Sequence, residues 1–255
     1  MSVDTGSKAV LITGAASGVG LETARRFAAA GMTVAINHLA EDPRGAAAIE
    51  ALRAEGLDVC GAPGNVGDAD GAAMAMEAAL EGTGGRLDYL VNNAGTPGGK
   101  SFVPYDDLDA LTEDFWQEIL SVNLVSMFRM TRLARRQLSE AGGAVVNIAS
   151  ITGFGQRGSS IAYAASKAGV VNLTISLARA LAPKVRVNAV APGIVDSSWL
   201  HFVTQEQKAS YADRTMLGRL AKPSDIADAI VFLCCGTSYM TGQTVVVDGG
   251  LTHGG

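Results

Sequence analysis

The sequence has few of the residues that mark disulfide-rich, metal-binding or nucleic-acid-binding proteins. Its three cysteines, Cys60, Cys234 and Cys235, form neither a disulfide framework nor a zinc spacing, and they are typical of buried thiols in a reducing compartment. The three histidines, at 38, 201 and 253, are scattered, so we expect no structural metal. The net charge of −5 is mild and offers no basic stripe, so nucleic acid is not an expected partner.

The chain also lacks long apolar runs. No positively charged start precedes an apolar stretch at the N-terminus, and no run approaches the roughly 18 residues that a membrane helix needs. We therefore expect a cytoplasmic protein with no secretion signal and no membrane partner. Hydrophobic residues still make up 48% of the chain, which is enough for a substantial core.

What the sequence does contain is an alternation of short β-branched runs with longer helical stretches. The expected strands lie at 9–12, 33–36, 57–60, 87–91, 144–148, 185–190 and 244–247, and the expected helices at 18–30, 43–54, 69–80, 113–139, 162–182 and from 223 onward. Repeated βα units with apolar strands predict a parallel sheet covered on both faces. We predict one α/β domain over residues 1–255, a doubly wound, Rossmann-like fold with a seven-stranded parallel sheet.

A glycine-rich turn follows the first expected strand directly. Gly14 permits a sharp turn, Gly18 lets a phosphate approach the backbone, and Gly20 lets helix and strand pack closely. Ser17 and Val19 would lie beside that phosphate at the helix start, where free N–H groups bind anions. The spacing matches neither G-x-G-x-x-G nor a P-loop, so an ordinary strand-to-helix turn is the alternative.

The end of the second expected strand bears on the choice of dinucleotide. A carboxylate there would hold the adenosine ribose and repel a 2′-phosphate, but the chain has Asn37 and His38. Arg44 is near enough in sequence to meet a phosphate. The sequence therefore favours NADP over NAD. Asn65 and Val66, after the third expected strand, could meet an adenine edge or form a simple turn.

Tyr163 and Lys167 are four residues apart on an expected helix, so they share a face. A phenol titrates near about 10 and carries protons poorly at neutral pH. A cation about 4 Å away favours the phenolate by about 4 kcal/mol at an effective dielectric of about 20. We therefore expect Lys167 to lower the pKa of Tyr163 and make it a general acid or base. A chance pairing is the alternative when these two residues are considered alone.

The set of motifs resembles the short-chain dehydrogenase/reductase family over nearly the whole chain. The glycine turn is similar to its cofactor turn, and Asn92-Asn93-Ala94-Gly95 to its motif after the fourth strand. Asn123, Ser150, Tyr163 and Lys167 occur in the order and spacing of its catalytic tetrad. Further matches are Pro192-Gly193, Ser197, Leu217-Gly218-Arg219, Pro223 to Ala227 and Gly242 to Gly250.

The resemblance implies hydride transfer between NADP(H) or NAD(H) and the CH–OH or C=O group of a small substrate. Tyr163 would exchange the proton, Ser150 would hold the substrate oxygen, Lys167 would also hold the nicotinamide ribose, and Asn123 would fix a relay water. The remaining expected cofactor contacts are Asn93, Ala94 and Gly95 near the ribose, and Pro192, Gly193, Ile194 and Ser197 near the nicotinamide.

The substrate and the assembly are less defined by the sequence. Expected pocket walls lie at 96–105, 151–162 and 195–217, and the last segment is a candidate lid that contains Trp199. Alternatives to a general alcohol dehydrogenase or carbonyl reductase are a 3-oxoacyl-carrier-protein reductase and a non-catalytic dinucleotide-binding regulator. Arginines at 129, 132, 135 and 136 could dock an acidic carrier or form a solvated face. Related proteins suggest a homotetramer.

Overall fold

The strands form one parallel sheet in the order β3-β2-β1-β4-β5-β6-β7. The computed structural model describes residues 8–99, 102–200 and 203–253. His201 and short parts of two expected pocket walls, at 100–101 and 201–202, lie outside the described residues. The strands are β1 Ala9–Ile12, β2 Thr33–His38, β3 Val59–Pro63, β4 Tyr89–Asn92, β5 Ala144–Ile148, β6 Arg186–Pro192 and β7 Thr244–Val247. The predicted seven-stranded, doubly wound α/β domain is confirmed.

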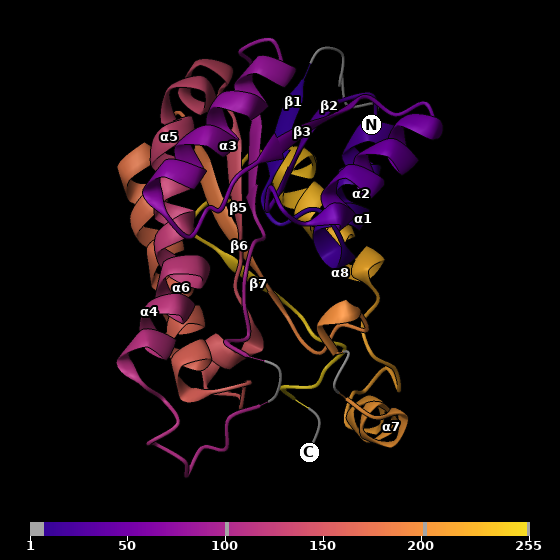
Figure 1. Cartoon of the computed structure of the whole chain (residues 1–255), viewed down its shortest axis with the longest axis vertical. Coiled ribbons are helices and arrows are strands. Elements are labelled where there is room, and N and C mark those ends of the chain that lie inside the picture. The colour runs from indigo at the N-terminus through magenta and orange to yellow at the C-terminus, as the bar shows by residue number, and fades with distance from the viewer. Residues whose placement is uncertain (1–7, 100–101, 201–202, 254–255) are drawn as a thin grey trace.

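Helices cover both faces of the sheet (Figure 1). One layer holds α1 Gly18–Ala29, α2 Pro43–Ala54 and α8 Pro223–Val231, and the other holds α3 Ala69–Gly82, α4 Glu113–Leu120, α5 Ser126–Ala141 and α6 Ile161–Leu181. The strands between the layers are apolar on both faces, because neither face meets water. Because helices cover both faces, a ligand can reach the sheet at the carboxyl ends of its strands.

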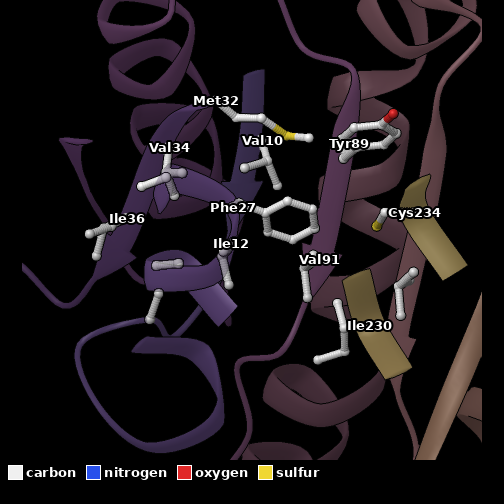
Figure 2. Packing of buried hydrophobic residues seen from close by; sticks show 14 of the residues in the cluster. Val10, Ile12, Phe27, Met32, Val34, Ile36, Tyr89, Val91, Ile230 and Cys234 are labelled. Atoms are coloured by element: carbon white, nitrogen blue, oxygen red, sulfur yellow. The ribbon is translucent and has the colours of Figure 1, made fainter. Parts of the chain in front are cut away.

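The core between the sheet and the α1/α8 layer centres on Phe27 (Figure 2). Its ring is fully buried and lies 6.1 Å from the ring of Tyr89, centroid to centroid. Cys234 packs in the same cluster, and burial raises the pKa of its thiol well above the ordinary value. This thiol behaves as a small apolar side chain.

The helix expected at 113–139 is interrupted. It divides into α4, a π-helical turn η1 at Ser121–Val125, and α5. The turn contains the fully buried Asn123, whose side chain bonds to the chain after β4. A π-bulge often occurs where a helix must present a side chain at a functional site, and apolar periodicity does not reveal it.

A second difference lies in the stretch after β6, which contains a helix that the periodicity did not predict. Helix α7 covers Gln205–Asp213 and begins with a capping box between Thr204 and Gln207. The Thr-x-x-Gln pattern was a usable signal for this helix start. The helix has no apolar stripe to mark it, and it lies apart from both layers (Figure 1).

Helix α6 is the one described helix that is long and apolar enough, by length and composition, to cross a membrane. It packs against β6 and β5, and it carries the buried Lys167. Core helices of globular proteins commonly have this composition.

Candidate active site

The predicted site residues gather at the carboxyl edge of the sheet, around the ends of β1 and β4. The strand order reverses there, since β1 pairs with β2 on one side and with β4 on the other. In an open α/β sheet this reversal creates a crevice outside the strand ends, where ligands bind. The glycine turn leaves β1 at this point and enters α1.

The glycine turn has a backbone that only glycine adopts readily. Gly14 and Gly18 have φ of +62° and +57°. A Cβ at Gly14 would lie 2.8 Å from the Ala94 Cα, and one at Gly20 would lie 2.6 Å from the Asn93 amide nitrogen. Ser17 is the N-cap residue of α1, yet its side chain makes no capping hydrogen bond. The turn therefore packs tightly on the chain after β4, with its helix N-terminus and the Ser17 hydroxyl available to a phosphate.

Two asparagines and a threonine brace this turn from neighbouring strands. The Asn93 amide donates to the carbonyls of Thr13 and Gly14, at 2.9 and 3.0 Å. The Thr13 hydroxyl accepts from the backbone N–H groups of Asn93 and Ala94, at 2.9 and 3.0 Å. The backbone N–H of Gly14 donates to Asn37 Oδ1 at 3.1 Å. Thr13 is the first residue of the glycine-turn motif, but the sequence did not indicate that its hydroxyl joins the turn to the chain after β4.

Asn37 and His38, the two residues at the end of β2 that were expected to contact the cofactor, lie in different surroundings. Asn37 is buried, and its amide donates to the carbonyls of Ala62 and Gly64, so its side chain is committed to holding β2 against β3. His38 is half-buried, and its ring lies where a Cβ on Gly45 would be. The nearby Arg44 is exposed and forms an ion pair with Asp42 at 2.8 Å.

The pair expected near the adenine lies at the end of β3. Asn65 is exposed, and its Oδ1 accepts from the Gly67 N–H at 2.9 Å. Val66 is buried in the core, and its carbonyl accepts from Arg129 at 2.8 Å. The two residues form a turn at the edge of the crevice, and the Val66 side chain faces away from it into the core.

Ser150, Tyr163 and Lys167 come together where β5 ends and α6 begins. Ser160 caps α6 by accepting from the Tyr163 N–H at 3.0 Å, which places Tyr163 in the first turn. Ser150 follows β5, is nearly buried, and hydrogen-bonds to the Tyr163 phenol. The Lys167 ammonium lies 5.6 Å from the centroid of the Tyr163 ring and donates to the Ile148 carbonyl at 2.7 Å. The three residues thus share one site, although they come from two elements.

Burial controls the ionisation of this group. Burial raises the pKa of Tyr163 to about 12, and the hydrogen bond from Ser150 acts in the opposite direction. Burial also lowers the pKa of Lys167 to about 8, since the charged ammonium loses its water. The expectation that Lys167 lowers the Tyr163 pKa is not met in this structure: desolvation raises that pKa, Ser150 opposes it, and the Lys167 ammonium is directed to the Ile148 carbonyl.

The buried Lys167 also tests the fit of a dinucleotide. An ammonium has three donors, and one of them goes to the Ile148 carbonyl. A nearly buried ammonium with donors to spare, beside a glycine turn and a phenol, suits the hydroxyl groups of a ribose. The residues present therefore fit a dinucleotide that lies from the glycine turn to Tyr163.

Asn123 joins the site through the loop after β4. Its Oδ1 accepts from the Thr96 N–H at 2.7 Å, and its Nδ2 donates to the Thr96 carbonyl at 2.9 Å and to the Ser166 hydroxyl at 3.4 Å. The carboxamide thus ties the π-helical turn to the segment after Gly95 and to α6. Sequence reasoning placed Thr96 in a pocket wall and gave Ser166 no role; it missed the contacts of both with Asn123, which exist only through the fold.

The chain after β6 closes the site from the other side. A Cβ on Gly193 would lie 2.9 Å from the Asp248 Cα, so this glycine allows close backbone approach. Ile194 accepts from the Ala221 N–H at 3.0 Å, and the Ser197 Cβ lies 3.7 Å from the Cβ position of Gly18. The segments after β1, β4, β5 and β6 therefore surround one crevice.

Comparison with known proteins agrees with this geometry. A family model described as Enoyl-(Acyl carrier protein) reductase matches residues 14–252. The chain is 34% identical to the 3-oxoacyl-[acyl-carrier-protein] reductase FabG of Aquifex aeolicus, over 98% of this chain and 100% of the relative. It is 38% identical to the cis-4-hydroxycyclohexanecarboxylate dehydrogenase of Sinomonas cyclohexanicum, over 96% of each chain. The crystal structure of a Brucella melitensis short-chain dehydrogenase/reductase, SDR:Glucose/ribitol dehydrogenase, superposes with a TM-score of 0.86 at 29% identity, over 98% of this chain and 99% of that one.

Proposed function

Because the chain belongs to the short-chain dehydrogenase/reductase family and is an NAD(P)-dependent oxidoreductase, we propose that Tyr163 is its proton-transferring residue. The observation that carries the proposal is the convergence of Ser150, Tyr163 and Lys167 at the carboxyl edge of the sheet, the edge at which the glycine turn also lies. The dinucleotide, when bound, supplies or accepts the hydride at the carbon of a small alcohol or carbonyl compound. The chain's own residues bind and orient both molecules and move the proton.

In the reducing direction, the substrate oxygen would lie between the hydroxyl groups of Ser150 and Tyr163. Negative charge builds on that oxygen as the carbonyl carbon is reduced, so two donors aimed at it lower the barrier. With a pKa raised to about 12, the Tyr163 phenol is protonated at neutral pH and is ready to give its proton to the oxygen. In oxidation the same oxygen of Tyr163 takes the proton, once the phenol has lost its own proton and stands as the phenolate.

Lys167 would hold the ribose next to the nicotinamide, with the donors that Ile148 leaves free. Asn123 would keep the loop after β4 in place through Thr96, and a relay water beside Lys167 would return the proton. The glycine turn, with Ser17 and Val19 at the helix start, would hold the pyrophosphate.

For the dinucleotide we propose a preference for NADP(H). Asn37 and His38 end β2, so no carboxylate there takes the ribose hydroxyls or repels a 2′-phosphate. Arg44 is 63% exposed, and its guanidinium can turn from Asp42 to the phosphate. Calorimetric titration should show tighter NADPH than NADH binding, and Arg44→Ala should weaken NADPH selectively. Tighter NADH binding would refute the preference.

A more specific candidate is a 3-oxoacyl-carrier-protein reductase, which the name of the Aquifex relative favours. The arginines of α5 are the residues to which an acidic carrier would dock, although Arg129 already donates to the Val66 carbonyl. Competition kinetics test this candidate: acyl-carrier thioesters must react better than simple ketones. A non-catalytic regulator is the weaker alternative, because it needs no buried lysine beside a tyrosine.

We also propose a cytoplasmic homotetramer. The support is the edge strand β7, where Val246 is 42% exposed on a strand that pairs only with β6 among the described strands. An apolar sheet edge open to solvent invites pairing with another copy. Sedimentation as a monomer at micromolar concentration would contradict the assembly.

The test of the proposed function is a panel of ketones and alcohols with each dinucleotide, followed at the absorbance band of the reduced nicotinamide. We expect turnover with at least one ketone, and its loss in Tyr163→Phe. A wild-type protein that binds dinucleotide but turns over no member of the panel, carrier thioesters included, would refute the proposal.

A further inference from the structure

Trp199 occupies an unusual place for a large aromatic residue. It lies on η3, a short turn at Ser198–Leu200, and keeps 37% of its surface exposed. Its ring is 6.5 Å from that of Tyr163, centroid to centroid, in an edge-to-face arrangement at 62°. On the other side, its Cη2 atom lies 3.3 Å from the Cβ position of Gly95. The indole therefore lies between the proposed proton donor and the loop after β4.

The segment that carries Trp199 is fixed at both ends. Val195 pairs with Ala221, and the Asp196 N–H donates to the Ala221 carbonyl at 2.8 Å. Leu200, directly after Trp199, is buried. These contacts hold the indole at Tyr163, so its position is set by the fold.

The charged groups of this segment are already paired. Lys208 on α7 donates to Asp196 at 2.7 Å, and this ion pair joins the lid helix to the same loop. Among the described residues 195–200, Asp196 is the one charged side chain. The surface that this segment offers to a substrate is therefore mainly the apolar indole.

This placement constrains the substrate. The reacting carbonyl oxygen must come within about 3 Å of the Tyr163 phenol, so a substituent on the reacting carbon meets the neighbouring indole. A flat aromatic substituent packs offset or edge-to-face against an indole, and such a contact raises affinity by roughly two- to tenfold beyond area burial. A flexible chain of equal size loses more rotamer freedom on ordering.

We propose that Trp199 is a specificity-determining residue that selects carbonyl compounds with a flat or cyclic apolar group on the reacting carbon. The inference rests on the proposed function, because it assigns the substrate class of the same site. It adds a residue outside Ser150, Tyr163 and Lys167 that contacts substrate but takes no part in proton transfer.

The kinetic test compares two ketones of equal carbon number, acetophenone and 2-octanone, with NADPH. We expect the wild type to favour acetophenone in kcat/KM. Trp199→Leu should lower kcat/KM for acetophenone about fivefold, chiefly through KM, and should change 2-octanone less than about twofold. Trp199→Phe, which keeps an aromatic ring, should retain the preference.

A binding measurement without turnover gives a second readout. Trp116 and Trp199 are the two tryptophans of the chain, so Trp116→Phe labelled with 5-fluorotryptophan has a single fluorine resonance, from Trp199. In the NADP-loaded protein, both ketones should shift this resonance, and acetophenone should do so with a dissociation constant about fivefold lower than that of 2-octanone. Tyr163→Phe in the same background should keep the shift, because Trp199 acts in binding.

The outcomes separate this inference from the proposed function. Equal losses for both ketones in Trp199→Leu, a wild-type preference for 2-octanone, or an unmoved fluorine resonance would overturn the role of Trp199 while leaving the reductase intact. If the wild type reduces neither ketone and the resonance still saturates at lower concentrations of acetophenone than of 2-octanone, the recognition stands and the chemistry must be sought elsewhere in the panel. If the resonance also stays fixed, the inference fails.

Discussion

Helices α6 and α7 are both connected to the candidate site, yet they are built in opposite ways. Helix α6 buries Ala162, Ser166, Lys167, Val170, Thr174, Leu177 and Ala178 against the sheet. None of the nine residues of α7, all of which the structure describes, is buried. Of the groups proposed for the chemistry, Tyr163 and Lys167 lie on the packed helix, whereas α7 is joined to the segment of Trp199 through the ion pair of Lys208 with Asp196. Proton transfer needs catalytic atoms that are held rigidly. Substrate selectivity needs a pocket-lining segment that can change in sequence with little loss of stability.

The largest effect should come from the packed helix. Tyr163→Phe removes one hydroxyl, and because general acid catalysis contributes 10² to 10⁴ in rate, turnover should fall about 10³-fold. NADPH affinity, measured by calorimetry, should change little. Tyr239→Phe is the matched control, since Tyr239 is fully exposed and its variant should keep full activity. Comparable turnover in the two variants would contradict the role of Tyr163.

The contrast in packing predicts a similar contrast in stability. Phe27→Ala should cost about 3–5 kcal/mol, because it empties a fully buried ring position in the main core. Tyr211→Ala in α7 should cost less than about 1 kcal/mol, because the helix packs loosely. Urea unfolding gives both values. If Tyr211→Ala destabilises the protein as much as Phe27→Ala does, α7 is packed as tightly as the core.

A comparison of Gly14 with Gly84 separates the free-energy cost of a left-handed backbone from the cost of a steric clash. Gly14 and Gly84 have nearly equal φ values, +62° and +65°, but a Cβ at Gly84 meets nothing within 4 Å. Gly84→Ala should therefore cost about 1–2 kcal/mol from its left-handed backbone alone. Gly14→Ala should cost more, because it also displaces the Ala94 backbone, and it alone should weaken NADPH binding. Equal effects on unfolding and binding would contradict the close packing.

The buried Lys167 predicts a dependence of stability on pH. Its folded pKa of about 8 is below the ordinary value of 10.5, so between these values the unfolded chain binds more protons. Stability from this group therefore rises as the pH increases from about 8 toward 10. Tyr163 has a raised folded pKa, so it acts in the opposite direction only above about 10.

The measurement is urea unfolding of the wild type and Lys167→Met at pH 7, 8, 9 and 9.8. Groups common to both proteins cancel in the difference between their free energies of unfolding. That difference should move in favour of the wild type as the pH rises. A flat difference would mean that Lys167 keeps an ordinary pKa in the folded protein.

The smallest effect on stability and activity is expected at the contact between α7 and the loop that carries Asp196. Lys208→Ala removes an ion pair with Asp196 in which the two side chains are 22% and 55% exposed, and pairs open to solvent contribute about 0–1 kcal/mol. Unfolding should shift by no more than this, and kcat should stay within about twofold. Lys208→Arg can keep the pair and is the control. If Lys208→Ala lowers kcat about as much as Tyr163→Phe does, then α7, and not α6 alone, controls the rate of the reaction.

Much of the fold could be predicted from the sequence because its signals are local. The apolar β-branched runs identified the strands, and the glycine turn was expected directly after β1, where the structure has it. Two errors have physical causes. The π-helical turn at Asn123 arises from hydrogen bonds to Thr96, 27 residues away, which helical periodicity does not contain. Helix α7 lacks an apolar stripe, because no surface covers it.

The sequence by itself determined that Tyr163 and Lys167 share a helix face, that Ser150 follows a buried strand, and that glycine forms the turn after β1. These follow from helix spacing, strand pattern and backbone sterics, which depend on neighbouring residues. The tertiary structure alone decided that burial raises the Tyr163 pKa, that Lys167 bonds to Ile148, and that Trp199 lies against Tyr163. Desolvation and contacts between distant segments exist only once the chain has packed.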